Sequence, residues 1–114
     1  MKTIDLARQV VESLEDKKAE DIILLDLQNL APVGNYFVIC SANNERALGG
    51  LRDAVLDSVK RMKISKPAVE GASKEGWMLV DFGSVIVHIF SNAQRQYYQL
   101  EELWSDAKVL LHVQ

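Results

Sequence analysis

Apolar residues recur every three or four positions in two segments of the chain, which is the spacing of an amphipathic helix. The first segment predicts a helix of about four turns near the N-terminus, and the second predicts a helix that Asn43 and Asn44 can cap. The apolar positions are Ile4, Ala7, Val11 and Leu14 in the first helix, and Leu48, Leu51, Val55, Val59 and Met62 in the second.

Gly49 and Gly50 interrupt the pattern of the second helix. Two glycines in a helix interior cost on the order of 2 kcal/mol relative to alanine. Two interpretations follow from this cost. Either a neighbouring element packs closely against the glycines, or tertiary packing tolerates a weakened start of the helix.

Short runs rich in β-branched and aromatic residues predict strands at 22–27 and 36–41, separated by a polar segment that contains Pro32 and Gly34. Residues 67–71 predict a short extended piece at a sheet edge, because Pro67 cannot donate a hydrogen bond to a strand ladder. The tail from Val109 to Gln114 is compatible with an added strand or with a disordered end.

A β-hairpin is predicted in most detail. Residues 77–82 and 85–90 are strand-like runs separated by Gly83-Ser84, which suits a tight two-residue turn. Such a turn sets an antiparallel register that pairs Phe82 with Val85, Asp81 with Ile86, Val80 with Val87, Leu79 with His88, Met78 with Ile89 and Trp77 with Phe90.

The two faces of this hairpin differ in chemistry. One face is apolar throughout and is expected to lie on the core: Met78, Val80, Phe82, Val85, Val87 and Ile89. The other face combines large apolar groups with one acid and one imidazole: Trp77, Leu79, Asp81, Ile86, His88 and Phe90. It is either covered by a helix that brings polar partners, or partly exposed to another molecule. His88 itself is expected to be a hydrogen-bonded structural histidine, because no second His or Cys has ligand spacing nearby.

The C-terminal segment shows helical spacing again. Its residues Tyr97, Leu100, Glu101 and Trp104 can share one side of a short amphipathic helix, with Leu103 and Ala107 beside them. The aromatic residues either anchor this helix on the sheet or contact a partner, because Tyr and Trp combine a large area with a hydrogen-bonding tip. Arg95 is expected to pair with a nearby carboxylate or with the partner, or else to be solvated.

Composition limits the class of protein. A chain of 114 residues with 48% hydrophobic content is expected to form one domain over residues 1–114 without disulfides or metals. We expect a soluble, cytoplasmic protein, because no segment is apolar enough to span a bilayer and residues 1–8 do not have the pattern of a signal peptide. Cys40 lies in an apolar strand pattern, where a buried thiol is expected.

The net charge of -3 argues against direct binding of nucleic acid, because neutralising phosphates requires clustered Lys and Arg. The lysines and arginines of this chain are scattered in small groups. A basic protein partner fits this charge better.

The stretch from about residue 26 to residue 104 resembles the Iojap family, whose bacterial members are called ribosomal silencing factors. The motifs that carry the resemblance occur in the family's order and spacing. They are Asn35-Tyr36-Phe37-Val38-Ile39, Glu70-Gly71, Trp77 through Asp81, Gly83, Val85-Ile86-Val87-His88, and Arg95, Tyr97, Tyr98, Leu100, Glu101, Leu103 and Trp104.

The resemblance implies a small α/β (α+β) domain with a mixed β-sheet and flanking helices, of nucleotidyltransferase-like topology and often a homodimer. It also implies a translational repressor without cofactors, which binds the large ribosomal subunit through its ribosomal protein fourteen and blocks joining of the small subunit. A large-subunit assembly factor that uses the same docking site is the alternative. The surface that meets the ribosomal protein is predicted to be formed or bordered by Trp77, Leu79, His88, Phe90, Arg95, Tyr97 and Tyr98.

Two departures from the family pattern concern loops: Asn35 stands where the family has an acid, and residues 43–47 replace a Ser/Thr-rich helix start. A role for these loop residues in partner binding is therefore not predicted. The competing class is a nucleotidyltransferase-like enzyme. Metal-assisted transfer requires paired carboxylates and a Gly-rich phosphate loop, and neither Asp26 nor Asp81 has a second acid two residues later. We therefore expect no catalytic activity.

Overall fold

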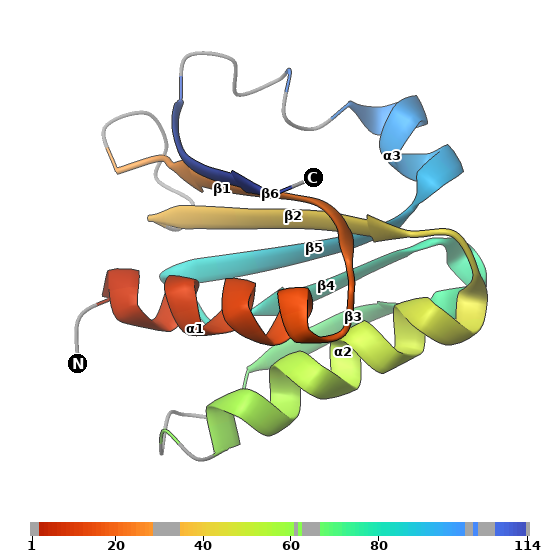
Figure 1. The fold of residues 1–114 in the computed structure, drawn as a ribbon, viewed down its shortest axis with the longest axis horizontal. Coiled ribbons are helices and arrows are strands. Elements are labelled where there is room, and N and C mark those ends of the chain that lie inside the picture. Colours follow the sequence, from red (N-terminus) through yellow and green to blue (C-terminus); the bar gives the residue numbers. More distant parts are fainter. Residues whose placement is uncertain are drawn as a thin grey trace.

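A six-stranded sheet forms the centre of the computed structural model, with helices α1 and α2 on one face and the short helix α3 on the other side, near the end of β5 (Figure 1). The structure describes residues 3–28, 35–60, 62, 67–99, 102 and 107–113. The elements are α1 (Thr3–Asp16), β1 (Glu20–Asp26), β2 (Tyr36–Ala42), α2 (Glu45–Lys60), β3 (Ala68–Ala72), the 3-10 turn η1 (Ser73–Glu75), β4 (Trp77–Asp81), β5 (Val85–Ser91), α3 (Asn92–Tyr98) and β6 (Lys108–Val113).

The strand order is β3-β4-β5-β2-β1-β6. The central pair β2 and β5 is parallel, and the other neighbouring pairs are antiparallel. The predicted α/β class with a mixed sheet and flanking helices is therefore confirmed. Its likeness to nucleotidyltransferases stays a prediction.

The hairpin register predicted from Gly83-Ser84 is confirmed. Trp77 pairs with Phe90, Leu79 with His88 and Asp81 with Ile86, and the backbone N–H of Phe82 donates to the carbonyl of Val85 at 2.9 Å. Gly83 has a φ of +87°, and its N–H donates to the Asp81 carboxylate at 2.7 Å. The left-handed backbone that this turn requires explains the glycine.

The main core lies between the sheet and helices α1 and α2. From the hairpin it takes Met78, Val80, Val85, Val87 and Ile89, with Phe82 packed against its margin, as the alternation of the two strands predicted. From the helices it takes the buried side chains Leu6, Ala7, Val10, Val11, Leu14, Leu48, Leu51, Val55 and Val59. Cys40 is buried in the same core, and burial raises the pKa of its thiol to about 12.

Helix α2 begins as predicted, because the Asn44 side chain accepts a hydrogen bond from the N–H of Ala47 at 2.7 Å. A Cβ added at Gly49 or Gly50 would meet no described atom within 4 Å apart from its chain neighbours and the backbone of its own helix. The interpretation that an element packs closely against these glycines is therefore wrong. They weaken the helix start, and the packing of Leu48 and Leu51 in the core offsets the cost.

The C-terminal helix differs from its prediction. Helix α3 covers residues 92–98 and ends at Gln99, which adopts a left-handed backbone with a φ of +47° and donates its N–H to the Arg95 carbonyl. Ala107 is not helical but leads into β6, and the remaining residues of the predicted helix face after Tyr97 lie outside the described residues.

The tail is an added strand, because Lys108–Val113 forms β6 on the free edge of β1. The edge piece predicted near Pro67 is β3, the outermost strand at the opposite end of the sheet. Within the described residues, no helix combines the length and apolar character needed to cross a membrane.

Candidate functional site

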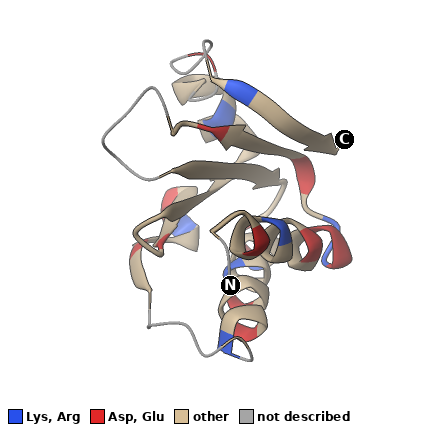
Figure 2. Ribbon diagram, turned by 90° about the vertical axis from the view of Figure 1, so that its left-hand side faces the viewer, with Lys and Arg blue, Asp and Glu red and all other residues tan. Residues whose placement is uncertain are grey.

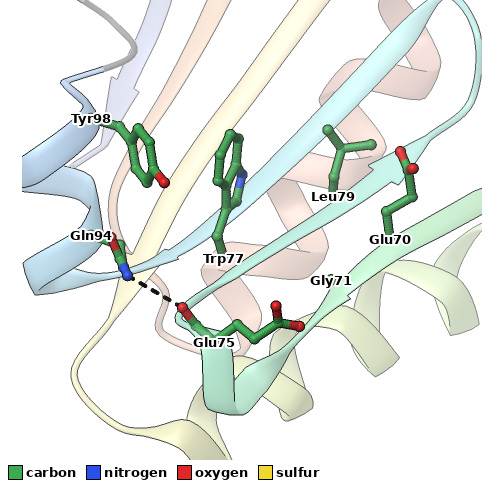
Figure 3. A pocket seen from close by; sticks show the side chains of 7 residues that line it. All are labelled: Glu70, Gly71, Glu75, Trp77, Leu79, Gln94 and Tyr98. Carbon is green, nitrogen blue, oxygen red and sulfur yellow. Dashed lines mark hydrogen bonds between the residues drawn. The ribbon is translucent and has the colours of Figure 1, made fainter.

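A groove of about 330 Å³ lies between the β3–β4 edge of the sheet and helix α3, on the face opposite to α1 and α2 (Figure 3). We call it the aromatic groove. It is lined by Glu70, Gly71, Glu75, Trp77, Leu79, Gln94 and Tyr98. These residues come from β3, η1, β4 and α3, so tertiary structure assembles the groove from segments that are separate in the sequence.

Stacked rings form the wall of the aromatic groove. The Trp77 indole stacks on Phe90 with ring centroids 5.1 Å apart, and the Tyr98 ring lies 4.7 Å from the same indole at an angle of 46°. Phe90 is fully buried, whereas Trp77 is half-buried and Tyr98 is 43% exposed. Phe90 therefore supports the two rings that the groove presents to solvent.

His88 lies beneath the aromatic groove and is only 5% exposed. The Trp77 Nε1–H donates to His88 Nδ1 at 3.4 Å, and the Phe37 ring lies 4.8 Å from the imidazole. Burial lowers the pKa of His88 to about 4, against a smaller opposing effect of the Asp81 carboxylate. At neutral pH the imidazole is therefore neutral, and its Nδ1 is free of a proton to accept from Trp77.

Arg95 points away from the aromatic groove. It is buried at 6% exposure and forms an ion pair with Asp21, with 3.4 Å between its Nη2 and the Asp21 Oδ2. Its Nη1 donates to the Asp21 carbonyl and lies 3.4 Å from the Ser41 hydroxyl. Of the alternatives for Arg95, pairing with a nearby carboxylate is the one that the structure shows.

The structure thus brings five of the seven predicted site residues together: Trp77, Leu79, His88, Phe90 and Tyr98. Tyr97 is 79% exposed beside them and meets Tyr98 edge-on at 5.0 Å. Phe90 and His88 are covered, while Trp77, Leu79 and the two tyrosines reach the surface. The second face of the hairpin, which combines large apolar groups with Asp81 and His88, is therefore buried along β5 and partly exposed along β4.

Three residues of the groove lining were not predicted from the sequence to belong to the site: Glu70, Glu75 and Gln94. Glu70 pairs with Leu79 in the β3–β4 ladder, which places both on the face of the groove. This register could not be read from the sequence, because β3 and β4 are joined by a 3-10 turn that ends at Gly76 rather than by a two-residue hairpin loop. Gln94 donates to the Glu75 carbonyl and connects α3 to that turn (Figure 3).

Charges are distributed unevenly over the molecule (Figure 2). Helix α1 is mostly acidic and α2 carries both acidic and basic residues, whereas β2 and β5 carry no Asp, Glu, Lys or Arg. Glu70 and Glu75 line the aromatic groove, and the lining contains no cation. Among the described residues, no three His, Cys, Asp or Glu side chains are arranged to hold a metal ion.

Gly71 is expected to be intolerant of substitution. It has a φ of +82°, and a Cβ there would lie 2.3 Å from the Trp77 carbonyl oxygen. Gly71→Ala should lower the free energy of unfolding by about 2 kcal/mol, from backbone strain and a displaced β3. Gly83→Ala is the matched control, because Gly83 has a similar φ but open space around it, and urea unfolding should show a smaller loss. Equal losses would contradict the steric argument.

Comparison with known proteins gives a consistent result. The family model described as "Ribosomal silencing factor during starvation" matches residues 1–114. A Bacillus subtilis protein named as a ribosomal silencing factor is 39% identical over 93 residues, which are 82% of this chain and 79% of that protein.

A crystal structure of a protein from Chromobacterium violaceum superposes with a TM-score of 0.88 at 31% identity, covering 92% of this chain and 88% of that one. A mouse protein named "Mitochondrial assembly of ribosomal large subunit protein 1" is 32% identical over 99 residues, which are 84% of this chain and 43% of the mouse protein. The α/β class with a mixed sheet and the family resemblance, both predicted from the sequence, agree with these comparisons.

Proposed function

Because the chain belongs to the ribosomal silencing factor family, we propose that it binds the large ribosomal subunit through ribosomal protein fourteen and blocks joining of the small subunit. The bound protein acts as a steric obstacle on the large subunit. We further propose that it works in the cytoplasm, performs no covalent chemistry and needs no cofactor.

The observation that carries this proposal is the aromatic groove. Trp77, Leu79 and Tyr98 present apolar and aromatic area to solvent, and such residues are enriched at the centres of protein interfaces. Glu70 and Glu75 add negative charge at the same place, which suits a basic ribosomal protein. Tyr97 extends the surface, His88 and Phe90 support it from beneath, and Arg95 contributes indirectly by pairing α3 with Asp21.

Trp77→Ala is expected to weaken binding to large subunits by about 2 kcal/mol, or about thirtyfold, if Trp77 is the central anchor of the interface. Sedimentation of purified large subunits with the protein measures this change. In a subunit-joining assay, stoichiometric wild-type protein should prevent association of the two subunits, and the variant should not.

Val69→Ala is the matched control for this truncation. Val69 is an exposed apolar residue of the neighbouring strand, and its pairing with Val80 places it on the opposite face of the sheet. It should leave binding unchanged. Circular dichroism must show that the Trp77 variant is folded, and wild-type binding by the folded variant would show that the aromatic groove is not the docking surface.

The second candidate function is assembly of the large subunit. The name of the mouse relative favours it, and docking at the same surface would serve either role. Large-subunit binding without inhibition of joining would support assembly over silencing. Homodimer formation is a family expectation that sedimentation equilibrium of the purified protein can measure.

A further inference from the structure

We infer that the aromatic groove is a receptor for one arginine side chain of the protein partner. This inference rests on the proposed function for the identity of the partner, but the chemistry of the groove argues for the arginine independently. Rings and carboxylates converge on one concave site, and this combination selects a planar cation over an apolar or anionic group.

The rings supply the first part of the recognition. Trp77 and Tyr98 lie 4.7 Å apart by ring centroids, and both are partly exposed to the groove. Phe90 and His88 hold the indole from behind, one by stacking at 5.1 Å and the other through the hydrogen bond to Nδ1. A cation over the rings of such a preorganised pair is attracted by their quadrupoles without further ordering of the indole.

The carboxylates supply the second part. Glu70 extends from β3 beside Leu79, and Glu75 extends from η1 on the other side of Gly71 (Figure 3). Within the described part of the chain, neither carboxylate forms an ion pair or accepts a hydrogen bond. Two uncompensated negative charges at the rim of an aromatic cavity attract a positive group, because the cavity wall contains no cation to neutralise them.

The combination of rings and carboxylates in the aromatic groove favours arginine over lysine. A volume of about 330 Å³ accommodates a long side chain together with its planar head group. A guanidinium stacks on an aromatic ring and donates hydrogen bonds in its plane to carboxylates on either side, whereas an ammonium does neither in a fixed geometry. Leu79 lies where the aliphatic stem of the arginine would pack.

The test is an NMR titration of the isotope-labelled full chain with a capped Gly-Arg-Gly peptide. The probe is the indole Nε1–H signal of Trp77, assigned by its absence in Trp77→Phe. The arginine peptide should shift this signal, and the neutral citrulline peptide of the same shape should shift it at least tenfold more weakly. Equal shifts from the two peptides would overturn the inference.

Glu70→Gln and Glu75→Gln should each lower the affinity for the arginine peptide by about threefold, and the double variant by about tenfold. Glu12→Gln is the matched control, because Glu12 is an exposed acid on α1, on the opposite side of the sheet from the groove. The affinity of this variant for the arginine peptide should equal that of the wild type. Unchanged arginine affinity in the double variant would overturn the inference.

Binding of large subunits separates this inference from the proposed function. If wild type and the double glutamine variant bind subunits equally well, the proposed function stands and the arginine receptor is wrong. If the arginine peptide binds with the stated charge dependence and wild type does not bind subunits, the groove is an arginine receptor for another protein and the proposed function is wrong.

Discussion

Lowering the pH from 6.5 to 4 should remove about 3 kcal/mol from the free energy of unfolding through His88 alone. Burial lowers the pKa of this imidazole to about 4 in the folded protein, against an ordinary value near 6.5. Protonation would place a charge among Phe37, Phe90 and Trp77 and would remove the acceptor that holds the Trp77 indole.

The direction of the effect follows from proton binding. Between pH 6.5 and pH 4 the unfolded chain binds a proton at His88 and the folded chain does not, so stability falls as the pH falls. The contribution of the neutral His88 is complete above about pH 6.5 and is lost by about pH 4. Stability above that window should not depend on this group.

Urea unfolding at a series of pH values measures the effect. His88→Phe keeps an aromatic ring against Phe37 but cannot titrate, so its stability should decline less between pH 6.5 and 4. The other histidine, His112, contacts the Asp21 carboxylate, so the comparison is made within the His88 position alone. Parallel curves for wild type and His88→Phe would contradict the assignment.

Asp21→Asn should lower the free energy of unfolding by about 3 kcal/mol, because it removes the carboxylate that forms an ion pair with the buried Arg95 guanidinium. This is the lower end of the usual range for a buried pair, since the Asp21 side chain is about half-exposed. Asparagine tolerates the left-handed backbone of Asp21, whose φ is +50°, so the substitution changes the charge with little added strain.

Glu20→Gln is the matched control for Asp21→Asn. Glu20 is the exposed acid immediately before Asp21 on β1, and removing its charge should change stability by less than about 0.5 kcal/mol. The double variant Asp21→Asn, Arg95→Met should be more stable than Asp21→Asn alone, because it removes the buried guanidinium together with the carboxylate that forms an ion pair with it. Equal urea midpoints for wild type and Asp21→Asn would contradict the importance of the pair.

Asp21 connects three elements that the sequence separates widely. It lies on β1, pairs with Arg95 of α3 and contacts His112 of β6 through its carboxylate. The Asp21 pair therefore holds α3 beside the sheet, and α3 supplies Tyr98 and Gln94 to the aromatic groove. A loss of this pair should weaken partner binding as well as stability.

The sequence could predict the hairpin fully because its information is local. A two-residue turn allows one register, and the period of two along each strand then assigns every side chain to a face. The core positions of Met78, Val80 and Val87 and the grouping of Trp77 with Leu79 and His88 both follow from it.

The bounds of helix α3 could not be predicted from the sequence because its end depends on one backbone conformation. Spacing predicted one helix from Tyr97 onward, but Tyr97 lies near the end of α3, which Gln99 terminates with a left-handed backbone. Neither Arg95 nor Asp21 carries a local signal for their ion pair, since they are 74 residues apart. Long-range contacts of this kind follow from the packing of elements, which the pattern of one segment does not encode.

By itself, the sequence determined the helices α1 and α2, the strands β1 to β5, the apolar core face of the hairpin and the set of residues on its second face. Only the tertiary structure decided which part of that second face is covered. The central position of β5 buries His88 and Phe90, while β4 lies next to the edge strand and leaves Trp77 and Leu79 partly open. Strand order decides this exposure, and it arises from contacts between segments far apart in the chain, which act only once the sheet has formed.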